Sequence, residues 1–417
     1  KVRVSFLIQI MFEERLMLKL RVLVMIDFLA VAILVPLLRS YFLDLNISTE
    51  KFGLMSSSYS LSQLLGGLLL GALSDKAFTR KNILILSFVG SAISYGMVGL
   101  SKSFQLLLVS RVVVGLVKQT MTVCTGILTE YLMDNDVPGA RAKEIGRLSA
   151  CATGAFVVGP IIGSNLFKIN RLLPPFVSSG LFMVNCLIVV FFFPSHQAKQ
   201  IKSQKTHTSL TKKLYETGHF FKQSYLNGCL SVVVAKLLMF FLQISMDRSL
   251  VVGYYEERWQ IESYMMGYLQ SYSTILTLIA QVYLVGLITS NASESKLIGA
   301  SLFMIALSAF IEANDVTFSQ YVTLSIPLRT ISKSLLSTSL QSLFTLRMPN
   351  EHIGAALGSM GALQSLTGVI APIYGSMIFQ RVDMYQRASI AGIHYLAAAL
   401  VWFMTSSTEG KAKSKSN

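Results

Sequence analysis

Six ionisable side chains lie inside long apolar stretches of the sequence, where a charge needs a physical reason. They are Asp27, Arg111, Lys118, Lys236, Arg329 and Lys333. A charged side chain at the centre of a bilayer costs ~2.5–3.5 kcal/mol on insertion scales, so such groups usually pair or mark a solute or ion pathway. Asp27 is the one acid that we place deep in an apolar stretch. Burial disfavours an ionised carboxylate and a neighbouring ammonium such as Lys118 favours it, so Asp27 is the candidate proton carrier.

Several of these groups also have a purely structural explanation. Asp27 and Lys118 can form an interhelical ion pair, with or without gating by a solute or protons. Lys236 lies near the end of its apolar stretch, so its ammonium can instead extend to the interface. Arg329 and Lys333 are one helical turn apart and share a face, so they repel each other. A nearby anion or carboxylate would offset this repulsion. Polar residues on apolar spans usually face the bundle, and the further candidates for a cavity lining are Tyr59, Gln63, Gln270 and Tyr272.

The elements that must position these groups are membrane spans. The chain has 417 residues, of which 53% are hydrophobic and 14% are charged, whereas soluble domains carry roughly 25% charged residues. A transmembrane helix needs about 20 mainly apolar residues. The sequence predicts an all-α polytopic membrane protein with twelve spans, at about 22–43, 52–74, 83–101, 104–132, 146–167, 175–194, 226–254, 263–289, 297–312, 319–346, 354–380 and 388–406.

An internal repeat indicates that the chain is a duplicated unit. Gly146–Phe167 aligns without a gap with Gly358–Phe379 at an offset of 212, and the identities include Pro160 with Pro372 and Gly163 with Gly375. Duplicated bundles with Gly- and Pro-containing spans at matching positions are typical of secondary transporters. Lys118 and Lys333 also coincide, at an offset of 215. We therefore expect equivalent helices of the two halves to direct charges at one central cavity.

The charge distribution predicts the topology and argues against nucleic acid as a partner. The net charge is +15, and with a cytoplasmic amino terminus about 22 Lys and Arg fall in cytoplasmic segments against about 9 outside. The basic linker is interpreted as a topology signal that also contacts anionic lipid. The predicted organisation is a cytoplasmic segment at 1–21, a six-helix bundle at 22–194, a basic cytoplasmic linker at 195–225, a second bundle at 226–406 and a cytoplasmic tail at 407–417.

Five motifs in order carry a family resemblance. Gly71-Ala-Leu-Ser-Asp75-Lys76, followed by Arg80-Lys81, resembles the loop signature of the major facilitator superfamily, with Phe78 in place of its usual glycine. Asp27 with Pro36 resembles the first span of its tetracycline-type drug/proton antiporters. The remaining matches are Arg111–Gly115 with the arginine motif, Glu130–Arg141 with the acidic loop, and Gly154 with Gly159-Pro160-Ile-Ile-Gly163-Ser164 with the fifth-helix antiporter motif. Val114–Thr120 also resembles an animal branch around major facilitator superfamily domain-containing protein 9.

The resemblance implies two pseudo-symmetric six-helix bundles that move a small organic solute by alternating access, with proton-coupled antiport. It assigns gating roles to Gly71, Asp75, Lys76, Arg80, Gly115, Gly159, Pro160, Gly163, Pro372 and Gly375. Two alternatives stay open, an uncoupled organic-anion facilitator and a non-transporting receptor or scaffold. The sequence has no metal-ligand cluster, phosphate-binding glycine loop or nucleophile elbow, so we predict neither an enzyme nor a cofactor. We expect a monomer, in either the plasma membrane or an endosomal or lysosomal membrane.

The charge count leads to a prediction about the solute. Five basic groups (Arg111, Lys118, Lys236, Arg329 and Lys333) stand against Asp27 alone. Arginine stays charged in proteins, whereas a buried lysine can lose its proton. An excess of positive charge predicts an anionic solute or counter-ion. The competing interpretation is a cationic or neutral drug, as the resemblance implies.

Overall fold

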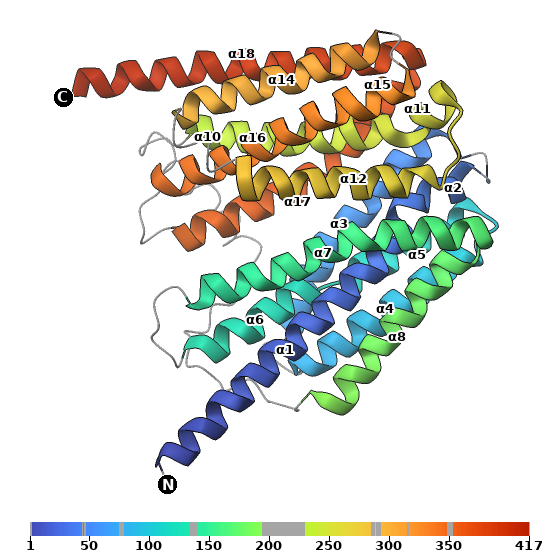
Figure 1. The fold of residues 1–417 in the computed structure, drawn as a ribbon, viewed down its shortest axis with the longest axis vertical. Coiled ribbons are helices and arrows are strands. Elements are labelled where there is room, and N and C mark those ends of the chain that lie inside the picture. The colour runs from blue at the N-terminus through green and yellow to red at the C-terminus, as the bar shows by residue number, and fades with distance from the viewer. Residues whose placement is uncertain are drawn as a thin grey trace. The chain divides into compact units, whose positions relative to one another are not determined.

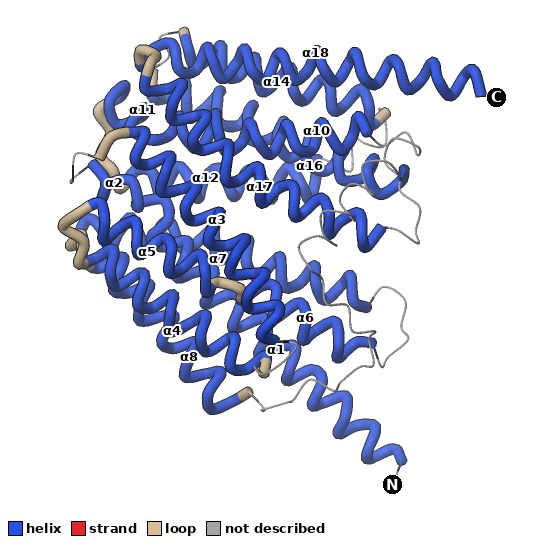
Figure 2. The backbone as a smooth tube through the Cα atoms, turned by 180° about the vertical axis from the view of Figure 1, so that it is seen from behind, coloured by secondary structure: helices blue, strands red, loops and turns tan. Residues whose placement is uncertain are grey.

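A computed structural model of the chain describes residues 2–43, 45, 47–74, 79–133, 140–193, 230–284, 288, 293–314, 317–347 and 353–416. All regular secondary structure in these residues is helical (Figures 1 and 2). An apolar chain in lipid must satisfy its backbone N–H and C=O groups internally, which a helix does within one segment. The predicted all-α class is confirmed.

The helices of the first half follow the predicted spans closely. They are α1 (Val2–Leu34), a 3₁₀ turn (Val35–Leu37) and α2 (Leu38–Leu43), then α3 (Thr49–Ser74), α4 (Arg80–Gly99), α5 (Phe104–Val117), α6 (Thr120–Met133), α7 (Ala140–Ile169) and α8 (Leu173–Phe192). The 3₁₀ turn contains Pro36, whose missing N–H weakens the helix there. Thr79 and Ser103 begin α4 and α5 because their hydroxyls accept N–H bonds from Asn82 and Leu106.

The second half contains helices interrupted by π-helical turns. They are α10 (Leu230–Leu242), a π-helical turn η2 (Gln243–Arg248) and α11 (Ser249–Trp259), then α12 (Met265–Ile279) with the π-helical turn Ala280–Leu284, α14 (Glu294–Ala313), α15 (Phe318–Gln320) with the π-helical turn Tyr321–Ser325, α16 (Ile326–Arg347), α17 (Ile353–Gln380) and α18 (Met384–Ser416). Single π-helical turns inside α-helices are frequent at functional sites.

Nine stretches among the described residues are long and apolar enough to cross a membrane. They coincide with nine of the twelve predicted spans. The other three predicted spans correspond to α3, to α12 with its π-helical turn, and to α15–α16, which do not meet the same test. The span expected at 104–132 is among the nine, and its helix is interrupted between α5 and α6. The predicted linker at 195–225 lies outside the described residues.

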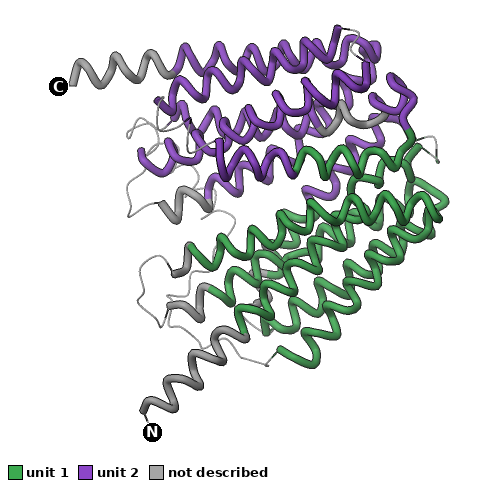
Figure 3. Tube along the Cα trace, in the orientation of Figure 1, with its two compact units in different colours: residues 1–47, 62–201, 262–274 green, residues 48–61, 202–261, 275–417 purple. Residues whose placement is uncertain are grey.

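The chain forms two compact units (Figure 3). The first unit contains residues 1–47, 62–201 and 262–274, and the second contains 48–61, 202–261 and 275–417. These units follow the two halves of the sequence, except that one helical segment of each half belongs to the other unit. The bundle boundaries read from the sequence remain a prediction.

The same packing recurs inside each unit, which extends the duplication beyond the fifth helix. In the first unit α4 packs on α5 and α8, and in the second unit α14 packs on α16 and α18. Ser94 Oγ donates to Ser110 O at 2.6 Å, and Ser308 Oγ donates to Ser325 O at 3.0 Å. These positions are offset by 214 and 215 residues. Small hydroxyl residues thus join equivalent helix pairs through interhelical hydrogen bonds.

The segment that each half contributes to the other unit, 262–274 in the first unit and 48–61 in the second, makes the same kind of glycine contact. In the first unit a Cβ on Gly267 of α12 would lie 2.1 Å from Ser164 Oγ and 2.5 Å from Pro160 O. In the second unit a Cβ on Gly53 of α3 would lie 2.2 Å from Ser376 Oγ and 2.8 Å from Pro372 O. Each repeat therefore places a glycine against the Pro-x-x-x-Ser stretch of the other repeat's fifth helix, where no larger residue fits.

Close packing of α7 on α1 explains two glycines of the fifth-helix motif. A Cβ on Gly159 would lie 2.5 Å from Ala32 Cβ, and one on Gly163 would lie 2.1 Å from Ile33 O. Pro160 lies between them, inside a continuous helix. The two glycines thus allow the two backbones to approach closely.

Replacement of Gly163 by Ala is therefore expected to destabilise the first unit. The clash involves a backbone carbonyl, and overpacking of this kind typically costs ~1–3 kcal/mol. The matched control is Gly154→Ala on the same helix, where an added Cβ meets nothing within 4 Å, so helix propensity favours Ala by about 1 kcal/mol. In thermal denaturation of the purified variants in detergent, Gly163→Ala should have a lower midpoint than Gly154→Ala. Equal midpoints would contradict the packing assignment.

Candidate functional site

A buried ion pair lies inside the first unit. Lys118 Nζ lies 2.6 Å from Asp27 Oδ1, and Thr120 Oγ1 donates to the same oxygen at 3.3 Å. Asp27 is 1% exposed, and its Oδ2 has no hydrogen-bond partner among the described residues. The ion pair that the sequence suggested is present. Its second carboxylate oxygen remains available to a proton or to a solute group.

A break in the fourth span places Lys118 at this position. Lys118 is extended (φ −76°, ψ 93°) and ends α5, and α6 starts at Thr120. The Gln119 N–H that leaves the helical ladder donates to Ser87 Oγ of α4 at 3.3 Å. Irregular backbone at membrane depth is tolerated where protein or a water-filled cavity surrounds it, and interrupted helices often form transport sites. Neither a proline nor a glycine lies at the break, so no local sequence signal predicts it.

Two aromatic rings connect Arg111 to the ion pair. The Arg111 guanidinium lies 5.3 Å from the centroid of the Tyr95 ring, and Lys118 Nζ lies 4.7 Å from that of Phe182. Tyr95 and Phe182 contact each other edge to face at 4.9 Å. Cation–π contacts contribute from ~0.5 to 2 kcal/mol, more where water is excluded. The described geometry brings Arg111, Lys118 and Asp27 into one cluster, and sequence reasoning missed its two rings.

The basic residues of the loop motif hold helix ends within the first unit. Lys81 Nζ donates to Val190 O at 2.9 Å and to Phe193 O at 2.8 Å, so it caps the carboxyl end of α8. Arg80 lies against α6, where a Cβ on Gly126 would be 2.2 Å from Arg80 Nη1. Gly71 is helical, and Gly115 is buried in α5. Asp75 and Lys76 lie outside the described residues, so their gating roles stay predictions.

The second unit contains a carboxylate that the sequence analysis did not count. Lys333 Nζ of α16 lies 2.5 Å from Asp247 Oδ2 of η2, and Tyr395 OH of α18 donates to the same oxygen at 2.8 Å. Lys333 and Asp247 side chains are 23% and 17% exposed. Asp247 lies inside the span expected at 226–254, within a continuous helical stretch from α10 through η2 to α11.

A second uncounted acid neutralises Arg329. Glu312 near the end of α14 forms an ion pair with Arg329 of α16, and its side chain is 0% exposed. The predicted excess of positive charge is smaller than we counted, because Lys333 and Arg329 each have a carboxylate partner. The shared face of Arg329 and Lys333 needs no bound anion. The signal that we missed is an acid at the end of one span and a base at the start of the next, which a helical hairpin brings together.

The other predicted residues have local partners. Lys236 Nζ donates to Gln341 Oε1 at 2.5 Å and lies over the Phe344 ring at 4.7 Å. Gln63 is exposed, and its carbonyl accepts from Gln119 Nε2 at 3.5 Å. The remaining candidates lie as follows: Gln270 is exposed and bonds to Thr274, Tyr59 and Tyr272 are half-buried, and Pro372 and Gly375 are buried in α17.

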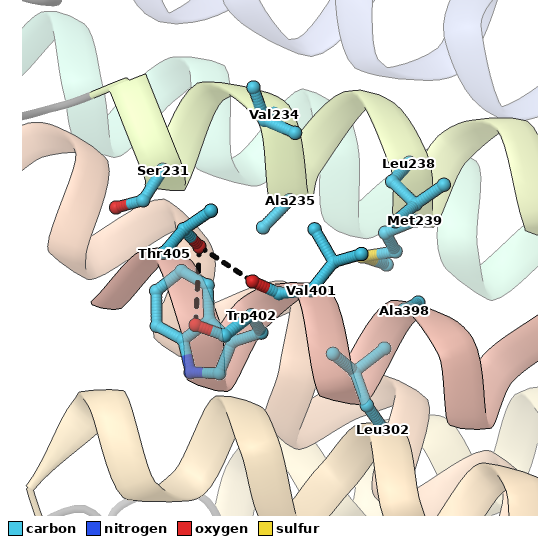
Figure 4. A pocket seen from close by; sticks show the side chains of 10 residues that line it. All are labelled: Ser231, Val234, Ala235, Leu238, Met239, Leu302, Ala398, Val401, Trp402 and Thr405. Atoms are coloured by element: carbon cyan, nitrogen blue, oxygen red, sulfur yellow. Dashed lines mark hydrogen bonds between the residues drawn. The ribbon is translucent and has the colours of Figure 1, made fainter. Parts of the chain in front are cut away.

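A small apolar pocket of the second unit lies apart from these ion pairs. It is formed by α10, α14 and α18, and its lining includes Leu238, Leu302 and Trp402 (Figure 4). Thr405 directs its hydroxyl at the carbonyls of its own helix, Val401 O and Trp402 O. None of the predicted site residues lines this pocket. Its lining offers packing surface rather than a set of convergent charges.

Comparison with known proteins establishes the class. The Major Facilitator Superfamily family matches residues 21–372, so the chain belongs to this superfamily. It is 25% identical over 366 residues to the tetracycline resistance protein, class C, of Escherichia coli, covering 85% of this chain and 87% of that protein. It is 22% identical to multidrug resistance protein 1 of Bacillus subtilis, covering 85% and 87%.

Solved structures show the same fold at low sequence identity. A crystal structure of a point mutant of the nucleoside transporter NupG matches with a TM-score of 0.75 at 14% identity, covering 94% of this chain and 99% of that one. The human organic anion transporter MFSD10 (TETRAN) matches with a TM-score of 0.66 at 17% identity, covering 94% and 99%. The chain is a multi-pass integral membrane protein and a secondary transporter of this superfamily, not an enzyme.

Proposed function

We propose that the protein exchanges a small organic solute for protons by alternating access, with Asp27 as the proton-binding group. The observation that carries this proposal is the Asp27 carboxylate, which is 1% exposed, has one oxygen bonded to Lys118 and Thr120, and has its other oxygen without a partner among the described residues. An ionisable side chain inside a membrane span is costly, and the carboxylates found there in pumps and transporters commonly relay protons.

The geometry links a change of charge at Asp27 to a change of backbone. A proton on Asp27 weakens the attraction for the Lys118 ammonium, which the Phe182 ring continues to hold. Lys118 also ends α5, so its movement acts on the break between α5 and α6. A solute group that bonds to Lys118 or to Asp27 Oδ2 competes with the proton for the same atoms. This competition is what exchange of solute for protons requires.

The relatives support a drug-like organic solute. The proteins of similar sequence are called tetracycline resistance and multidrug resistance proteins. We infer no charge for the solute, because the described acids Asp247 and Glu312 pair with Lys333 and Arg329. The spans are mainly apolar, so they suit an aromatic and aliphatic solute that binds through apolar contacts and few charged ones.

The prolines of the repeat remain proposed hinges. Pro160 and Pro372 lie inside continuous helices, and their carbonyls lie close to Gly267 and Gly53. Proline removes one backbone hydrogen bond and so allows a helix to bend. Pro160→Ala is expected to slow transport while leaving the thermal midpoint and solute binding nearly unchanged. Unchanged flux in proteoliposomes would reduce the motif to a packing feature.

The exchange itself is tested in proteoliposomes with an imposed pH gradient. A solute is first found by thermal-shift screening, since a ligand that binds only the folded state raises its stability. We expect the purified protein to accumulate this solute against its gradient when the pH gradient is present, and to collapse the pH gradient as it does so. An uncoupled facilitator would only equilibrate the solute. A receptor or scaffold would bind the solute and move none of it.

A further inference from the structure

The Asp247 cluster of the second unit has the same chemistry as the Asp27 cluster of the first. In both, a lysine and a hydroxyl donate to one and the same carboxylate oxygen. Lys118 and Thr120 bond to Asp27 Oδ1, and Lys333 and Tyr395 bond to Asp247 Oδ2. The two lysines occupy equivalent positions of the duplicated sequence. In the first cluster the remaining oxygen, Asp27 Oδ2, has no hydrogen-bond partner among the described residues.

The neighbouring charges separate Asp247 from the other acid of this unit. Glu312 of α14 is fully buried and pairs with Arg329 of α16, whose guanidinium stays charged. Asp247 is 17% exposed and pairs with a lysine that is itself 23% exposed. The Asp247 pair is therefore closer to solvent than the Glu312 pair, whose carboxylate is 0% exposed.

The elements that pack on η2 bring few other charges to Asp247. α16 contributes Lys333 and Arg329, α18 contributes Tyr395, and α11 contributes Tyr254 and Arg258, which bond to each other. The only charged side chain of α10 is Lys236, which bonds to Gln341, and the part of α17 whose side chains are described has none. The charge state of Asp247 therefore depends mainly on Lys333, with Arg329 and Glu312 largely cancelling each other.

We infer that Asp247, with Lys333 and Tyr395, is a second proton-binding site, so that each unit of the transporter carries one. A hydronium ion gives its proton to a lone pair of an Asp247 carboxylate oxygen: one hydronium O–H bond breaks, a carboxyl O–H bond forms, and a water molecule leaves. Lys333 keeps its own proton. The neutral carboxyl then releases its hold on Lys333, and the π-helical turn η2 can reorganise. The use of this proton in transport rests on the proposed function, but the binding of the proton does not.

Carbodiimide labelling tests the inference without a known solute. Dicyclohexylcarbodiimide is a membrane-soluble reagent that adds to protonated carboxyl groups in apolar surroundings, and the adducts are located by peptide mass spectrometry. The purified transporter is labelled over a series of pH values. We expect Asp247 and Asp27 to be labelled increasingly as the pH falls. The Asp247→Asn variant is the control, because its amide cannot react with the carbodiimide.

Two variants of Lys333 sharpen the test. Lys333→Gln removes the adjacent positive charge, so Asp247 should be labelled at a higher pH than in the native protein. Lys333→Arg keeps the charge and should retain the profile of the native protein, which decides the matter if Lys333→Gln does not fold.

Labelling of Asp27 without labelling of Asp247 would overturn the inference and leave the proposed function standing. Labelling of neither carboxylate would overturn both. An unchanged yield of the labelled peptide in Asp247→Asn would also overturn the inference, because the reagent would then not be reporting the Asp247 carboxyl.

Discussion

Asp27→Asn is expected to abolish uptake of solute against its gradient and to spare solute–solute exchange. The amide keeps the size of the side chain and one oxygen for Lys118 and Thr120, which bond to Asp27 Oδ1 in the native protein. It cannot bind and release a proton, so the two half-cycles lose their coupling. The loss should be complete for pH-driven accumulation, measured in proteoliposomes, whereas counterflow should continue.

Lys118→Gln provides the matched control for this variant. It leaves a buried Asp27 without its ammonium partner, and the uncharged form of the carboxyl is then favoured. We expect coupled uptake to persist only at higher pH in this variant. A gradient-driven accumulation in Asp27→Asn that equals that of the native protein would show that the coupling proton binds elsewhere.

Glu312→Gln is expected to destabilise the second unit more than any other single change of a buried charge described above. It leaves Arg329 in a buried position without a counter-ion, and breaking a buried ion pair from one side costs ~3–5 kcal/mol. Arg329→Gln should cost less, because the remaining carboxyl can become neutral by taking up a proton while a guanidinium cannot lose one. Thermal denaturation in detergent measures both variants.

The double variant Glu312→Gln with Arg329→Gln shows how much of the destabilisation comes from an unpaired buried charge, because it lacks the ion pair but leaves no charge behind. Two neutral amides can bond to each other, so we expect it to be more stable than Glu312→Gln alone. An unchanged midpoint in Glu312→Gln would mean that Arg329 finds water or another acceptor, and that this ion pair is peripheral.

The sequence predicted the helices and the duplication well, because both depend on local patterns. Apolar runs of membrane length must be helical in lipid, and the alignment of Pro160 with Pro372 corresponds to two helices with the same glycine contact, at Gly267 and Gly53. The Asp27–Lys118 pair was also foreseen as one of two alternatives, since two opposite charges in neighbouring spans have a strong reason to meet.

The sequence could not show which charges meet across helices that lie apart in the chain. Asp247 and Lys333 are 86 residues apart, and their contact depends on how α16 and α18 pack beside the π-helical turn. The break at Lys118 is equally non-local, because its stabilising partner is a serine hydroxyl on another helix. Counting intramembrane acids from span boundaries therefore missed Asp247 and Glu312. The charge that we inferred for the solute rested on that incomplete count.

Proton release on solute binding tests the central claim most directly. The purified transporter, in weakly buffered detergent solution, is mixed with a saturating amount of the solute found by thermal shift, and the change of pH is read with a dye. We expect the native protein to release protons at a pH where Asp27 is partly protonated, and the Asp27→Asn variant to bind the solute with a clearly smaller release. Proton release that is identical in the two proteins, or absent from the native one while the solute binds, would contradict the account.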